Sequence, residues 1–252
     1  EAKAAQAAPP AAGAAAAAPQ AAADAPPSSI PYHGRRRTIG ERMLQSATST
    51  AQVTLSSEVA VDEAVKMAHG LSREWRREGV IVTLTGLAVR ACALALREHP
   101  RLNARLEGDA IIIEPRVNVG VAVDNEQGLV VPVIRDADKG SLKEVVVALR
   151  EVTERARADR LRPEDVAGGT FTVSSLEGTG VDAFTPLINP PQAAILGIGR
   201  VREAPAFDGP HIVRRQAATL SLTFDHRVTD GAPAARFLDR VAELLGRPYL
   251  LM

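Results

Sequence analysis

The sequence predicts an α/β fold, a two-layer sandwich in which helices lie against a mixed β-sheet. Segments with the two-residue repeat of strands and segments with the helical repeat alternate irregularly, and several predicted strands follow one another without a helix between them. No Gly-x-Gly-x-x-Gly motif joins a strand to a helix, and the chain has no P-loop. The pattern therefore favours a mixed sheet over a regular doubly wound one.

The first 29 residues are mostly Ala and Pro, without large apolar side chains. Proline at positions 9, 10, 19, 26 and 27 interrupts every long run of Ala. Such a composition predicts an extended, flexible linker that rises about 3 Å per residue. The remainder, residues 30–252, is long enough to form one domain with a substantial core.

The first half of this domain is predicted to hold three helices and several strands. Apolar spacing and turn residues place, in order, a helix over 37–50, a strand over 52–61, helices over 62–78 and 83–100, and two short strands that end at Ile113. Asp62 and Thr83 are the expected caps of the second and third helices.

The second half is predicted to be richer in strands. We expect a hairpin or a strand–loop–strand from 117–123 and 129–134, a helix from 141 to 158, strands over 170–174, 193–201 and 220–224, and a last helix over 233–245. Ser141 and Glu144 have the spacing of a capping box at the start of the fourth helix.

Composition excludes several classes of function. Thirty basic and thirty acidic residues cancel, so no overall field attracts nucleic acid or an anionic membrane. No apolar run reaches membrane-spanning length. Cys92 is the single cysteine, which excludes an internal disulfide, and no histidine pair has the spacing of metal ligands. Without an initiator Met or a signal peptide, the chain is expected to be a fragment of a longer protein from a reducing compartment.

The stretch 220–231 is the main candidate for a functional site. Leu220, Leu222 and Phe224 alternate as in a half-buried strand, which runs directly into a cluster of ionisable groups. His226, with the carboxylate of Asp230 four residues later, could hold an imidazole over a cleft. Alternatively, the cluster is a solvated turn in which His226 only ends the strand. Strand ends accommodate both arrangements.

Residues 225–231, Asp-His-Arg-Val-Thr-Asp-Gly, resemble the Asp-His-Arg-x-x-Asp-Gly signature of the acyltransferase components of 2-oxoacid dehydrogenase complexes. The shorter His-x-x-x-Asp-Gly core is shared with chloramphenicol acetyltransferase. Three further blocks resemble the first family more closely, namely 168–176, 188–196 and 119–132. The similarity extends over residues 30–252, and the Ala/Pro segment resembles the linkers of these proteins.

The resemblance implies a chloramphenicol acetyltransferase-like fold and transfer of an acyl group from S-acyl-dihydrolipoamide to the thiol of coenzyme A. Acetyl is the first choice of acyl group and a branched-chain group the second. By the resemblance, His226 is the catalytic base, and Ser174 donates a hydrogen bond to the thioester oxygen. Asp230 forms a structural ion pair with an arginine, for which Arg37 and Arg42 are candidates. The alternative for Ser174 is an ordinary strand hydroxyl.

Contacts with coenzyme A are expected at positions where related enzymes touch it: Thr83, Asp124, Ser175 and Gly199. Their alternative roles are a helix cap for Thr83, a turn carboxylate for Asp124 and ordinary strand positions for the other two. The lipoyl group would be carried on a domain absent from this chain. No metal is expected.

The resemblance also implies a homotrimeric building block that assembles into a 24-mer or 60-mer, with the active site between subunits. The E1 and E3 enzymes of the complex would bind through upstream domains not present here. The apolar end, Pro248–Met252, is expected to dock on another subunit. The expected location is the bacterial cytoplasm or the mitochondrial matrix. Two alternatives remain: a free-standing coenzyme A acetyltransferase of the chloramphenicol type, and a non-catalytic core scaffold.

Overall fold

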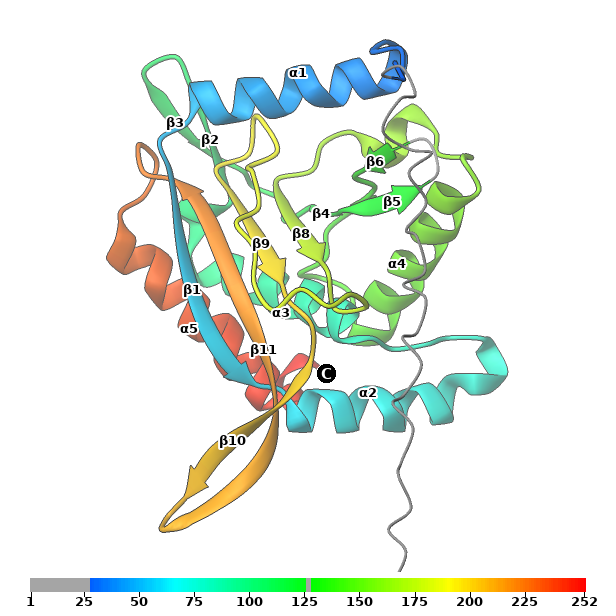
Figure 1. Cartoon of the computed structure of the whole chain (residues 1–252), viewed down its shortest axis with the longest axis vertical. Helices are drawn as coiled ribbons and strands as arrows, with labels where there is room; N and C mark the ends of the chain where they lie inside the picture. Colours follow the sequence, from blue (N-terminus) through cyan, green and yellow to red (C-terminus); the bar gives the residue numbers. More distant parts are fainter. Residues whose placement is uncertain (1–27, 126–127) are drawn as a thin grey trace, which may run out of the picture. The chain divides into compact units, whose positions relative to one another are not determined.

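A mixed sheet organises the chain (Figure 1). Its strand order is β1-β11-β9-β8-β4-β7, and β10 pairs with the outer part of β11. The central strand β8 runs parallel to β4 and β9, whereas the other pairs are antiparallel. The strands are β1 Gln52–Ala60, β4 Val119–Val121, β7 Val133–Ile134, β8 Phe171–Ser175, β9 Ala194–Ile198, β10 Arg202–Asp208 and β11 His211–Asp225.

The computed structural model describes residues 28–125 and 128–252. Residues 1–27, nearly all of the predicted linker, lie outside the described part, so that prediction is untested. Within the described part, His33–Met252 forms one compact unit.

Helices cover one face of the sheet and close the core. They are α2 Asp62–Glu74, α3 Leu84–Glu98, α4 Leu142–Arg157 and α5 Gly231–Gly246, with short 3₁₀ helices η2 Trp75–Glu78, η3 Pro100–Leu102, η4 Pro163–Val166 and η5 Pro248–Leu251. Phe171 and Phe224 of the sheet and Phe237 of α5 are among the largest fully buried side chains. Alternation along β8 and β11 sends one set of side chains into this core and the other set to the opposite face. The predicted two-layer α/β sandwich with a mixed sheet is confirmed.

Helix α1, Gly34–Ser49, is mostly exposed and lies across one end of the strands (Figure 1). Its buried Ser46 donates a hydrogen bond of 2.5 Å from Oγ to the backbone oxygen of Ile188. The helix begins three residues before the predicted start at 37, because the apolar spacing does not register its exposed first turn.

The predicted caps differ in outcome. Ser141 and Glu144 form the expected capping box of α4, and the Thr83 hydroxyl accepts a 3.1 Å hydrogen bond from the Gly86 N–H at the start of α3. The prediction for Asp62 is wrong. Its carboxylate accepts from the Gln216 N–H of β11 at 2.9 Å, and Val61 occupies the cap position of α2.

The segment 117–134, predicted as a hairpin or a strand–loop–strand, forms strands of two separate ladders. β4 and β7 pair in the main sheet, whereas β5 Val123–Asn125 and β6 Gly128–Val130 form a separate ladder. Two short strands, β2 Ala104–Glu107 and β3 Ala110–Ile113, form another. The backbone N–H of Ala122 bonds to the Val173 oxygen at 2.9 Å, so β5 begins beside the end of β8.

The C-terminal segment is only partly available to a second chain. Leu251 is fully buried in its own subunit, whereas Tyr249, Leu250 and Met252 are exposed. Cys92 is buried in α3, and burial raises the pKa of its thiol well above the usual value. No helix among the described residues is long and apolar enough to cross a bilayer.

Candidate active site

Strand β11 ends at Asp225, and His226 lies in the tight turn that follows at the edge of the core. The turn is closed by backbone bonds from Val228 and Thr229 to the Asp225 oxygen, at 2.9 and 3.3 Å. The backbone N–H of His226 bonds to the Ala51 oxygen at 2.8 Å, which ties the turn to the chain just before β1. The imidazole itself is about half exposed, with its ring centroid 5.8 Å from that of Phe224. The structure therefore presents an accessible histidine on a fixed backbone.

Asp230 lies near His226 but does not bond to it. The distance from His226 Nδ1 to Asp230 Oδ1 is 3.8 Å, and the Asp230 side chain is 75% exposed. That separation exceeds an ordinary hydrogen bond. The pair can attract each other when the imidazole is protonated, but Asp230 does not fix the orientation of the ring.

Among the described residues of this chain, the arginine expected beside Asp230 is not found. Arg37 instead bonds to Glu41 at 2.8 Å, one turn along α1. The carboxylate that pairs with an arginine in this turn is Asp225, whose partner is Arg227. Sequence reasoning missed this pair. The alternation of side chains along β11 does indicate that Asp225 is buried, because it lies on the same face of the strand as Ser221 and Thr223, which are both buried.

Ser174 lies at the other end of the sheet, on β8. Its side chain is half-buried, and its hydroxyl makes no hydrogen bond to another described residue. It pairs in register with Gly197 of β9, where an added Cβ would come 2.9 Å from the ring of Phe184. Paired residues of adjacent strands share a face, so Ser174 and the Phe184 ring lie on the face away from the helices. The hydroxyl is thus a free donor in a confined, partly apolar setting.

The register keeps Ser174 and His226 apart within one chain. Ser174 is the register partner of Gly197 of β9, and Gly197 is the register partner of Ser221 of β11. His226 follows Ser221 by five residues along β11, two strands away from β8, so the two positions are roughly 20 Å apart. Within one chain, the His226 imidazole and the Ser174 hydroxyl are therefore too far apart to contact the same small group.

The four positions expected to touch coenzyme A gather around the end of β8. Ser175 pairs with Ile198, the neighbour of Gly199, and Asp124 lies on the exposed edge of β5. Thr83 caps α3, whose Thr85 hydroxyl bonds to Glu177 at 3.0 Å, just beyond Ser175. The structure therefore brings all four to the Ser174 end of the sheet.

Two of these positions also have structural roles. The Thr83 hydroxyl already caps its helix. At Gly199 an added Cβ would lie 1.9 Å from the Asp182 oxygen, so backbone packing alone requires glycine there. Glu177, which sequence reasoning missed, lies among them. Burial raises the pKa of its carboxyl, although the hydrogen bonds from Thr85 act in the opposite direction.

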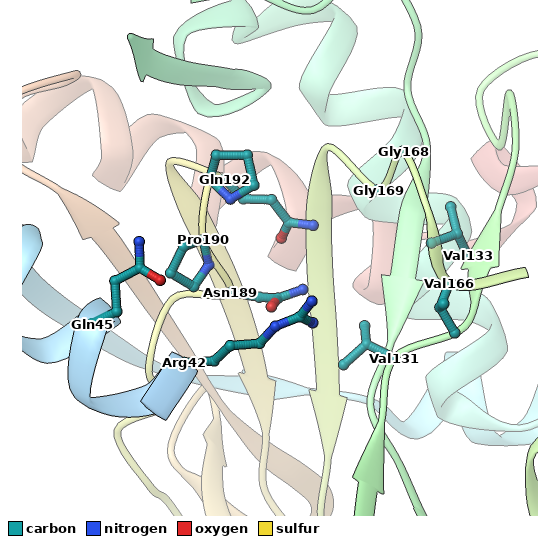
Figure 2. Close-up of a pocket in the computed structure, with 11 residues that line it drawn as sticks. Arg42, Gln45, Val131, Val133, Val166, Gly168, Gly169, Asn189, Pro190 and Gln192 are labelled. Carbon is teal, nitrogen blue, oxygen red and sulfur yellow. The ribbon is translucent and has the colours of Figure 1, made fainter. Parts of the chain in front are cut away.

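A separate polar pocket of about 400 Å³ opens between α1 and the starts of β8 and β9 (Figure 2). Arg42 projects into it beside Asn189, with Gln45 and Gln192 on its walls (Figure 2). Arg42, one of the two candidate partners of Asp230, therefore lines this pocket, whereas His226, Ser174, Asp230 and the four positions expected to touch coenzyme A do not. Among the described residues, no ion pair joins Arg42 to Asp230. The described residues contain no cluster of three or more potential metal ligands.

Comparison with known proteins identifies the family. The model of the 2-oxoacid dehydrogenases acyltransferase catalytic domain matches residues 24–252. The acetyltransferase component of the acetoin cleaving system of Bacillus subtilis is 42% identical over 88% of this chain and 56% of its own length. The acetyltransferase component of the pyruvate dehydrogenase complex of Cupriavidus necator is 37% identical over 83% of this chain and 38% of its own. The chain thus spans about half the length of such relatives, or less.

Comparison with solved structures leads to the same family. The cubic core of a pyruvate dehydrogenase multienzyme complex superposes with a TM-score of 0.84 at 36% identity, over 89% of this chain and 93% of that one. The dihydrolipoamide acetyltransferase of Azotobacter vinelandii gives 0.83 at 35% identity, over 87% and 91%. Chloramphenicol acetyltransferase shares the fold, with a TM-score of 0.53 at 15% identity over 81% and 94%. The chain belongs to the family of 2-oxoacid dehydrogenase acyltransferase catalytic domains.

Proposed function

We propose that this domain transfers an acetyl group from S-acetyl-dihydrolipoamide to the thiol of coenzyme A. The observation that carries the proposal is the accessible His226 on its fixed turn, together with the free Ser174 hydroxyl. The Azotobacter vinelandii structure was solved to study one serine, one histidine and one asparagine in catalysis. Those three residues have the same sequence spacing as Ser174, His226 and Asp230, which supports the same site here, with aspartate in place of asparagine.

The chemistry follows from what each side chain can do. A thiol with a pKa near 8.5 is only a few per cent thiolate at neutral pH, so a base must remove its proton as attack begins. His226 takes that proton while the coenzyme A sulfur bonds to the thioester carbon. Ser174 donates a hydrogen bond to the oxygen that becomes negative. The carbon–sulfur bond to dihydrolipoamide then breaks, and the leaving sulfur receives the proton from His226.

Assembly is part of the same proposal. His226 and Ser174 lie at opposite ends of one sheet, so the proposed mechanism needs His226 from one copy and Ser174 from a second. We propose a homotrimer with three such sites, built into a larger core as a 24-mer or 60-mer. One similar structure is a cubic core. Tyr249, Leu250 and Met252 offer an exposed apolar contact between trimers.

The remaining proposals concern the longer protein. The acetyl group would arrive on a lipoyl group carried by another domain, and the E1 and E3 enzymes would bind upstream of residue 30. Thr83, Asp124, Ser175 and Gly199 are proposed to line the coenzyme A path, because all four lie at the Ser174 end. The curated relatives reported above are bacterial, which favours the cytoplasm over the mitochondrial matrix.

The test is transfer from S-acetyl-dihydrolipoamide to coenzyme A by the wild type, His226→Ala and a control, His211→Ala. His211 is an exposed histidine at the start of β11, remote from the turn. We expect His226→Ala to lower kcat about 10²- to 10⁴-fold without loss of assembly, and His211→Ala to match the wild type. Equal activity of all three proteins would instead indicate a scaffold. Faster acetylation of small alcohols than of dihydrolipoamide would indicate an enzyme of the chloramphenicol type.

A further inference from the structure

The two residues that flank His226 in the sequence, Asp225 and Arg227, form an ion pair. Asp225 is 3% exposed, and its carboxylate accepts hydrogen bonds from two nitrogens of the Arg227 guanidinium: from Nε to Oδ1 at 3.0 Å and from Nη2 to Oδ2 at 2.6 Å. Two backbone N–H groups complete its shell, those of Arg227 at 3.1 Å and Ala51 at 3.2 Å. The residues before and after His226 are thus joined through their side chains.

The backbone of the turn is fixed at each of these positions. Asp225 N–H bonds to the Ala193 oxygen at 2.9 Å, and His226 N–H bonds to the Ala51 oxygen at 2.8 Å. The imidazole, by contrast, has no hydrogen bond to orient it, since Asp230 is 3.8 Å away. Apart from the contact with the ring of Phe224, whose centroid is 5.8 Å away, control of the direction of the imidazole must therefore come from the backbone of the turn.

Closing a turn with a buried carboxylate costs free energy. Placing a charge in a nearly water-free position costs free energy that an ion pair only partly offsets, and a neutral side chain could accept the same backbone N–H groups. Burial would raise the pKa of Asp225, but the side-chain and backbone bonds from Arg227 and the bond from Ala51 lower it below the usual value. The carboxylate stays ionised, so the pair persists at neutral pH.

We propose that the Asp225–Arg227 ion pair is a positioning clamp, which sets the direction in which the His226 imidazole leaves the end of β11. This inference rests on the proposed role of His226 as the base. Arg227 touches no reacting atom in this scheme and acts through the backbone of the turn. Its two-point contact with Asp225 is what a guanidinium supplies and a single ammonium does not.

The test compares Arg227→Gln and Arg227→Lys with Arg240→Gln. Arg240 makes an equivalent pair with Glu98 on the surface of α5, with Nε at 3.1 Å from both carboxylate oxygens. We expect both Arg227 variants to lower kcat by about 100-fold, with the KM for coenzyme A and the particle mass unchanged. Arg240→Gln is expected to keep kcat within about twofold of the wild type.

Chemical rescue separates positioning from folding. Arg227→Gly leaves room beside Asp225, and added ethylguanidinium is expected to restore kcat at least about tenfold. Arg227→Gln and Arg227→Lys with wild-type kcat would overturn the clamp while His226→Ala remains inactive. A loss of kcat that follows loss of particle mass, without rescue, would also overturn it. If His226→Ala itself is fully active, the proposed function fails and the clamp with it.

Discussion

The two ends of the central sheet are built differently. At the end of β11, His226 stands exposed on a turn that hydrogen bonds and an ion pair hold in place. At the end of β8, Ser174 sits half-buried among glycines over which an aromatic ring and a backbone segment pack. The first end offers a group that can gain and lose a proton in contact with solvent, and the second offers a fixed donor in a confined space.

The difference matches the two catalytic roles that we propose for His226 and Ser174. A base must exchange protons, which exposure permits, whereas a donor to a developing negative charge works best when it is preset and shielded from water. The register places these environments roughly 20 Å apart in one chain. We propose that a second copy brings them together, so we expect activity to require assembly as strictly as it requires either residue.

Gly199 tests whether tight packing defines the Ser174 end. In Gly199→Ala the new Cβ would lie 1.9 Å from the Asp182 oxygen, so the segment that carries Asp182 must move. We expect a loss of about 3 kcal/mol in the free energy of unfolding, measured by urea denaturation. The matched control is Gly70→Ala, because Gly70 lies in α2 with no atom within 4 Å of the added Cβ. That change is expected to stabilise the protein by up to about 1 kcal/mol.

If Gly199→Ala were as stable as Gly70→Ala, the close contact at the end of β8 would not be a constraint. The contrast between the two ends would then reduce to the exposure of His226 and Ser174.

One carboxylate at each end, Glu177 near Ser174 and Asp225 before His226, is expected to affect stability in opposite directions. Both effects should be smaller than that of Gly199→Ala. Burial raises the pKa of Glu177, so its stabilisation is complete below pH 4.5 and is lost as the pH rises through the folded pKa. The pKa of Asp225 is lowered, despite burial, by its hydrogen bonds, so its stabilisation is present above pH 3.8 and is lost as the pH falls through the folded pKa.

Melting temperatures measured from acidic to neutral pH test the predicted directions for both carboxylates. At neutral pH we expect Glu177→Gln to raise the melting temperature slightly and Asp225→Asn to lower it. Both differences from the wild type should shrink in acid, where the native carboxyl groups are protonated. Shifts in the same direction at neutral pH would contradict the distinction between the two ends.

The sequence was sufficient for the architecture and for the location of the histidine. Alternation in the strands, the Ser141 capping box and the Asp-His-Arg-x-x-Asp-Gly block each act locally, so each can be recognised without the fold. The partner of Asp62 could not be predicted, because Gln216 reaches it only through the pairing of distant strands. Arg227, two residues from Asp225, was missed for another reason. The alternation along β11 indicates that Asp225 is buried, but not that Arg227 turns back to pair with it.

The separation of Ser174 from His226 is likewise a property of register. Neither residue's neighbours in the sequence reveal which positions of β8, β9 and β11 lie side by side. The structure supplies that register, on which the proposal of a site shared between two copies rests.

Mixed assemblies test the shared site most directly. Chains with His226→Ala and chains with Ser174→Ala are coexpressed in equal amounts, and acetyl transfer to coenzyme A is compared with that of each variant alone. If each site joins two copies, random mixing gives intact sites at about a quarter of the positions, and about a quarter of wild-type kcat returns. Activity no greater than the mean of the two single variants would contradict the account, because it would mean that both residues act within one chain.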